Sequence, residues 1–286
     1  MKNIGVILFC GGILMTFAIN ATELKKALHS SKHPFDYELG IRIIPGTKQK
    51  APTTICCHGY GYSNAIIDVV HSFGVIQNHL VSFNFPDYEC VAKKYDPKKS
   101  NFGSIDEVLP LLYVIKKCVI DANIDVINLY GFSAGGGAVI NTLAVLNQNL
   151  YDEQLKKIGI DTDAKKNIIS AIEKGLIILD CPLKSIDEIM EMRGKDPEFE
   201  ILSQRYIKNN MRPIDSIEKT AGLNLTILLH FQMPDEILGN RDDKLFADRL
   251  TVANKGKTYV IFGNDGGHNR FHTSLWKKYK TILSSK

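Results

Sequence analysis

The chain has 286 residues, of which 44% are hydrophobic and 23% are charged, and its formal net charge is +4. This composition predicts a folded protein with a sizeable buried core and excludes an intrinsically disordered chain. The net charge is too small to indicate a nucleic-acid partner, and the absence of any run of five or more like charges argues against a polyanion-binding tail.

The first 21 residues differ from the rest of the chain. Lys2 provides a basic start, residues 4–19 carry no charge, and the small residue Ala21 follows. This order is typical of a secretory signal peptide, and the uncharged run is shorter than the ~20 residues that a membrane-spanning helix needs. We therefore predict a signal peptide at 1–21, a domain at 22–286 and an exported protein, either periplasmic or secreted. An uncleaved membrane anchor is the alternative.

Removal of the signal peptide would leave five of the six cysteines, so at least one would stay unpaired. One or two disulfide bridges remain open in an oxidising compartment, and the sequence does not reveal their pairing. Cys56 and Cys57 are adjacent and should lie on opposite faces of a strand. We interpret them as small buried residues, with metal ligands or a redox pair as the alternatives.

Short apolar runs alternate with longer helical patterns along the chain. Helices are expected at residues 63–73, 104–122, 134–146, 243–254 and 271–283, and strands at residues 53–57, 80–85, 125–130, 175–179, 225–231 and 258–262. Ser63 is a candidate N-cap, and Ser104 and Glu107 have the spacing of a capping box. This alternation predicts a mostly parallel sheet covered by helices on both faces. Residues 149–174 and 182–222 are helix-like and charged, and the second stretch could form a small cap.

The run Gly131-Phe132-Ser133-Ala134-Gly135 matches G-x-S-x-G between an expected buried strand and an expected helix. A serine on such a tight turn has its hydroxyl exposed at the carboxyl edge of the sheet. The flanking glycines avoid clashes with the neighbouring elements, and the helix N-terminus favours negative charge. Ser133 is therefore the candidate nucleophile.

With this motif the chain resembles the α/β-hydrolase superfamily over about residues 37–284. The resemblance implies the α/β-hydrolase fold, with a mostly parallel central sheet and a small helical cap, and a serine hydrolase with a Ser-acid-His order along the chain. His58-Gly59-Tyr60-Gly61 follows the first expected strand. By resemblance, an oxyanion hole would use the backbone N–H groups of Tyr60 and Ala134. His58 is expected to brace this loop instead of transferring protons.

The resemblance also points to the base and the acid. His268 follows a glycine after the last expected strand, where the superfamily has its catalytic histidine, and His272 is the runner-up. Asp235 matches the strand, short loop and D-x-apolar-apolar pattern of the superfamily's acid, although Gln232 stands where glycine is more common. Asp180 is an alternative acid, Asp242 and Asp243 are alternatives that fit helix caps better, and His230 is expected to be a packed structural residue.

These features predict a carboxylesterase-type enzyme that cleaves small-molecule acyl esters of short or medium chain through an acyl-enzyme. No cofactor or metal is expected, because the sequence lacks H-E-x-x-H, clustered histidine–carboxylate spacing and a G-x-x-x-x-G-K-[ST] loop. A peptidase or amidase of the prolyl-oligopeptidase type is an alternative, suggested by the paired glycines after Ser133. A catalytically silent binding protein on a hydrolase scaffold is another.

Overall fold

The computed structural model describes residues 21–29, 35, 39–47, 51–74, 77–86, 100–194, 196–264, 266–269 and 272–284. The predicted signal peptide lies outside these residues except for Ala21, where a short helical stretch over residues 21–29 begins. Cys10 and Cys90 also lie outside them. The four cysteines within them, Cys56, Cys57, Cys118 and Cys181, are buried free thiols.

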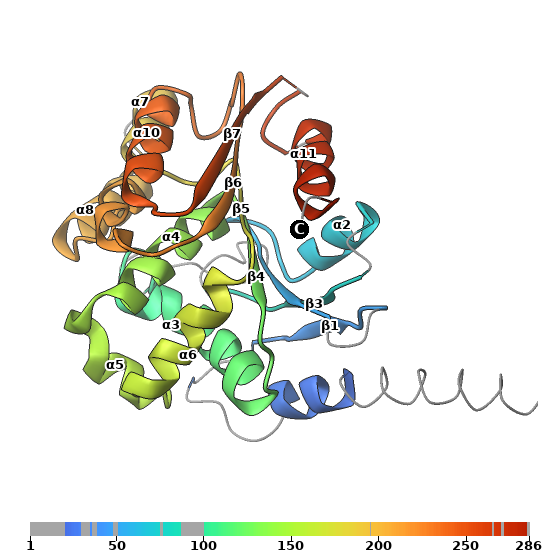
Figure 1. The fold of residues 1–286 in the computed structure, drawn as a ribbon. Helices are drawn as coiled ribbons and strands as arrows, with labels where there is room; N and C mark the ends of the chain where they lie inside the picture. The colour runs from blue at the N-terminus through green and yellow to red at the C-terminus, as the bar shows by residue number, and fades with distance from the viewer. Residues whose placement is uncertain are drawn as a thin grey trace, which may run out of the picture.

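In the described part of the chain, seven strands form one sheet in the order β1-β3-β2-β4-β5-β6-β7, and every neighbouring pair except β1–β3 is parallel (Figure 1). This arrangement confirms the predicted mostly parallel sheet. The strands are β1 (Arg42–Ile44), β2 (Thr53–Cys57), β3 (His79–Ser82), β4 (Ile127–Phe132), β5 (Ile177–Asp180), β6 (Thr226–Gln232) and β7 (Lys257–Gly263).

Helices cover both faces of this sheet (Figure 1). One face packs against α2 and α11 and the other against α3, α4, α6 and α10, with separate apolar clusters between the sheet and each layer. The helices are α2 (Ile66–Ser72), α3 (Ile105–Lys116), α4 (Ala134–Asn147), α5 (Asp152–Lys157), α6 (Thr162–Glu173), α7 (Asp187–Arg193), α8 (Pro197–Lys208), α9 (Pro213–Ser216), α10 (Asp243–Ala253) and α11 (Thr273–Ser284), with a π-helical turn η1 (Lys117–Asp121) and 3₁₀ turns η2 (Asn149–Tyr151) and η3 (Glu218–Thr220).

The central strands are apolar because both of their faces are covered. Every residue of β4 and β5 is buried, as parallel strands between two helical layers require. Cys57 packs in one apolar cluster and Cys56 in the other, which confirms that their side chains lie on opposite faces. By contrast, every residue of β7 except Gly263 is exposed or half-buried, because β7 is an edge strand.

The Ser63 cap and the Ser104–Glu107 capping box do not form as predicted. Helix α2 begins at Ile66 instead of residue 63, and the Ser63 hydroxyl accepts a 3.3 Å hydrogen bond from the Ala65 N–H in the preceding turn. Ser104 does occupy the N-cap of α3, but its hydroxyl donates to the Asn101 carbonyl. The Glu107 carboxylate accepts from the Gly103 N–H, so the reciprocal capping box does not form.

Candidate active site

Ser133 lies at the carboxyl end of the central strand β4, directly before α4. Its φ of +54° and ψ of −122° are strained for a residue with a side chain. Several backbone hydrogen bonds hold this turn: the Ser133 N–H donates to the Asp180 carbonyl at 3.0 Å, and the Ser133 carbonyl accepts from Leu183 at 2.8 Å and from Gly136 at 2.9 Å. The strained serine is therefore fixed to both β5 and the following helix.

The glycines around Ser133 are required by the closeness of neighbouring backbone. A Cβ on Gly131 would lie 2.7 Å from the Gly135 carbonyl oxygen, and a Cβ on Gly135 would lie 2.6 Å from the His58 carbonyl oxygen. Both separations are shorter than real Cβ contacts, so only glycine lets β4, α4 and the turn after β2 approach this closely.

His268 and Asp235 meet across the sheet edge although 33 positions separate them in the chain. The His268 Nδ1–H donates to Asp235 Oδ2 at 2.7 Å, and both side chains are buried. The ring of His268 also packs against Phe132, with 5.1 Å between ring centroids. His268 is thus oriented by a carboxylate on one nitrogen, next to the residue that precedes Ser133.

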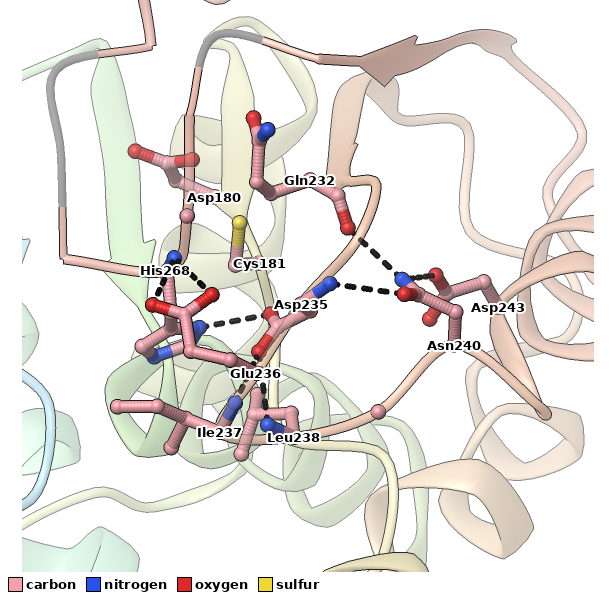
Figure 2. Close-up of polar contacts among 12 residues, drawn as sticks. Asp180, Cys181, Gln232, Asp235, Glu236, Ile237, Leu238, Asn240, Asp243 and His268 are labelled. Atoms are coloured by element: carbon pink, nitrogen blue, oxygen red, sulfur yellow. Dashed lines mark hydrogen bonds and ion pairs between the residues drawn. The ribbon is translucent and has the colours of Figure 1, made fainter.

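The loop after β6 keeps Asp235 in place (Figure 2). Asp235 Oδ1 accepts backbone N–H bonds from Ile237 at 2.9 Å and Leu238 at 2.7 Å. The Asp235 N–H in turn donates to Asn240 Oδ1 at 2.8 Å. Burial alone would raise the pKa of Asp235, but the His268 bond and the two backbone donors outweigh burial and hold this pKa below its usual value. Asp235 therefore stays an anion beside His268.

A buried ion cluster supports the same loop from the side of α10. The Lys184 ammonium lies 2.5 Å from Asp243 and 3.1 Å from Glu188, and donates to the Gly239 carbonyl at 2.9 Å. Burial raises the pKa of Asp243, and the Lys184 charge offsets only part of this effect. Asn240 links this ion cluster to the Asp235 loop. Its amide N–H groups donate to Asp243 Oδ2 and to the Gln232 carbonyl, and its Oδ1 accepts from the Asp235 N–H (Figure 2).

Asp242 and Asp243 lie at the start of α10, as expected of capping residues, but neither side chain makes a capping bond. Asp242 occupies the N-cap position without a side-chain capping bond and pairs with Arg241, whereas Asp243 pairs with Lys184. Neither contacts His268 among the interactions of the described residues. Gln232 ends β6 with a buried side chain.

A pocket of about 180 Å³ opens beside Ser133 and His268. The predicted oxyanion residues Tyr60 and Ala134 line it as well. The Tyr60 hydroxyl donates to Glu198 on α8 at 2.7 Å, which ties the turn after β2 to the segment between β5 and β6. Most of the remaining wall is apolar and comes from that segment and the Asp235 loop: Leu183, Ile186, Ile189, Phe199, Leu202, Ile237 and Leu238. Tyr62, Phe102 and Asn269 complete the lining.

The remaining histidines have other surroundings. His58 is fully buried, with its Nδ1–H donating to the Gly59 carbonyl and its Nε2 accepting from the Phe85 N–H. These bonds agree with the bracing role expected for it. His230 is packed inside the sheet, as expected, and both it and His272 bond to Asp180. The predicted alternatives Asp180 and His272 thus pair with each other, separately from Asp235 and His268.

Within the described ranges, no helix has the length and apolar character needed to cross a bilayer.

No protein-family model matches this sequence, and no curated protein matches it significantly. Solved structures do resemble it. An esterase from Pyrococcus furiosus superposes with a TM-score of 0.52 at 17% identity, over 82% of this chain and 81% of that one. Esterase B from Lactobacillus rhamnosis superposes with a TM-score of 0.55 at 13% identity, over 96% of this chain and 94% of that one. An acylaminoacyl peptidase bound to a chloromethyl ketone superposes with a TM-score of 0.58 at 16% identity, over 88% of this chain and 40% of that one. The sheet order, the strand–serine–helix turn and these likenesses together establish that this chain has the α/β-hydrolase fold.

Proposed function

We propose that this protein is a serine hydrolase that cleaves acyl esters through a Ser133-His268-Asp235 triad. The observation that carries the proposal is the 2.7 Å bond between His268 and Asp235 at the pocket that Ser133 lines. An acid that holds its partner histidine on Nδ1 leaves Nε2 as the base toward the serine.

In this mechanism His268 takes the Ser133 proton as the serine oxygen attacks the acyl carbonyl. The Tyr60 and Ala134 N–H groups stabilise the tetrahedral oxyanion, and Ala134 is the first residue of α4, where the helix dipole favours negative charge. His268 then protonates the leaving alcohol, and a water activated by the same histidine cleaves the acyl-enzyme. The buried Asp235 anion stabilises the imidazolium formed in both steps.

The pocket walls support an uncharged acyl group of short or medium length. Apolar side chains from α7, α8 and the Asp235 loop surround the space next to Ser133, and a hydrocarbon chain there would be removed from water. A carboxylic ester is therefore our first choice of substrate.

A peptidase or amidase is the second candidate. The paired glycines Gly135 and Gly136 after the serine and the likeness to an acylaminoacyl peptidase favour it. Turnover of p-nitroanilides against the matching p-nitrophenyl esters distinguishes the two substrates.

The test is labelling with a fluorophosphonate probe together with turnover of p-nitrophenyl acetate and butyrate. We expect Ser133→Ala to abolish labelling, and Ser133→Ala and His268→Ala to lower kcat by roughly 10⁴-fold or more. Asp235→Asn should lower kcat by about 10³- to 10⁴-fold, whereas the matched change Asp242→Asn should leave it nearly unchanged. A folded wild-type protein that neither labels nor turns over any ester or anilide would instead support a binding protein on a hydrolase scaffold.

A further inference from the structure

A second polar cluster lies beside the proposed triad. Asp180 is the last residue of β5, and Cys181 follows it directly. His230 lies in β6, and His272 directly precedes α11. All four side chains are at least nine-tenths buried. The cluster adjoins the triad because the Cys181 sulfur lies within 4.8 Å of the nearest ligand atoms of Asp235 and His268 (Figure 2).

The four side chains offer the atoms that zinc prefers. One carboxylate oxygen, one sulfur and two imidazole nitrogens lie within 4.8 Å of one another. Asp180 Oδ1 is 3.0 Å from His230 Nδ1 and 2.6 Å from His272 Nδ1, and the Cys181 sulfur is 3.8 and 3.9 Å from the same nitrogens. Ligand atoms around a tetrahedral zinc ion lie about 3.3 to 3.6 Å apart, so each of these four distances would change by less than about 1 Å on binding.

The hydrogen bonds of His272 require a proton or a cation between its Nδ1 atom and Asp180. His272 Nε2 lies 3.2 Å from the Gly267 carbonyl, which can only accept, so this nitrogen carries a hydrogen. In a neutral His272 the Nδ1 lone pair would then face the oxygen of Asp180. Either a proton shared between Nδ1 and this oxygen or a cation between them removes the repulsion of their lone pairs.

Two further features fit a bound metal ion. A zinc ion bound by one carboxylate, one thiolate and two neutral imidazoles forms an electrically neutral group, and no lysine or arginine of the described residues pairs with Asp180. The outer atoms are also arranged as in metal sites: His272 donates to a backbone carbonyl, and the Tyr130 hydroxyl donates to Asp180 Oδ2 at 3.0 Å.

An entry route exists as well. A second pocket, of about 100 Å³, is lined by Asp180, His272 and Tyr130 together with apolar residues of α2 and α11. An ion could therefore reach the cluster from outside without passing through the Ser133 pocket.

We propose that Asp180, Cys181, His230 and His272 bind one zinc ion in a closed, four-coordinate structural site. Binding displaces the thiol proton of Cys181 to solvent. The ion joins the ends of β5 and β6 to the chain after β7 and so anchors the segment that carries His268. Because the four ligands fill the shell, no position is left for a catalytic water.

The experiment measures metal in the full-length chain, purified without a metal-affinity tag from zinc-supplemented medium. Elemental analysis should find about one zinc per chain. Cobalt added to the metal-stripped protein should give a thiolate-to-cobalt charge-transfer band. Cys181→Ala should lose this band, and His272→Gln should bind zinc at least about a hundredfold more weakly. The buried controls Cys118→Ala and His79→Gln should retain the metal.

A chelator should lower the melting temperature of the wild-type protein and leave that of Cys181→Ala unchanged. Wild-type protein that is folded by circular dichroism yet binds neither zinc nor cobalt would overturn the proposal, and would leave His272 as an imidazolium paired with Asp180. Equal metal content in wild type and Cys181→Ala would overturn it too, independently of whether Ser133 reacts with a fluorophosphonate.

Discussion

The buried His58 should make the stability of this protein depend on pH. Burial lowers the pKa of His58 to about 4 from 6.5, and its bond to the Gly59 carbonyl offsets only part of that effect. In the folded protein His58 is neutral, because its Nε2 accepts from the Phe85 N–H. Between these pH values the unfolded chain binds more protons than the folded one. The stability linked to His58 is therefore fully present above about pH 6.5 and is lost as the pH falls toward 4.

The size of this effect follows from the two pKa values. A shift of one pKa unit corresponds to about 1.4 kcal/mol, so the full contribution of His58 to the free energy of unfolding is about 3 kcal/mol. About 2 kcal/mol of this contribution is already lost at pH 5. His58→Gln removes the titration while its amide can still accept from Phe85.

The assay is urea unfolding of wild type and His58→Gln at pH 7.5 and pH 5.0. From pH 7.5 to pH 5.0, the free energy of unfolding of the wild type should fall by about 2 kcal/mol more than that of the variant. Between pH 7.5 and 8.5 the two proteins should change in parallel, which serves as the internal control. An equal fall in the free energy of unfolding of both proteins from pH 7.5 to pH 5.0 would refute the reasoning.

Three substitutions test the packing around the site, each by urea unfolding. Ser133→Gly should be about 1 kcal/mol more stable than Ser133→Ala, because glycine relieves the positive φ; equal stability would mean that the turn is not strained. Gly135→Ala should destabilise by about 3 kcal/mol or more, because its Cβ would press on the backbone of Cys57; a loss under about 1 kcal/mol would contradict that contact. Lys184→Met should cost about 3 to 5 kcal/mol because it leaves two buried carboxylates unpaired, whereas the exposed Lys244→Met should cost under about 1 kcal/mol; similar costs would rule out the buried cluster as a source of stability.

Sequence patterns predicted the buried strands of the sheet well, but they predicted some strand ends and the edge strand β1 poorly. Strand β2 begins and ends where its apolar run does, because a strand buried on both faces is apolar throughout. Strand β4 begins two residues later than predicted, at Ile127, after a turn in which Asn123 has a positive φ. Strand β1 was not predicted, since three half-buried residues carry no periodic signal and only pairing with β3 makes them a strand.

The sequence by itself determined the parallel sheet and the position of Ser133, because a strand, a glycine-flanked serine and a helix are encoded within a few consecutive residues. The tertiary structure alone decided which acid meets which histidine. Asp180 ends strand β5 and Asp235 follows strand β6, yet His268 bonds to Asp235 and His272 to Asp180. Those contacts depend on the order of β5, β6 and β7 in the sheet, which brings residues 33 and 92 positions apart to one edge and which no local pattern records.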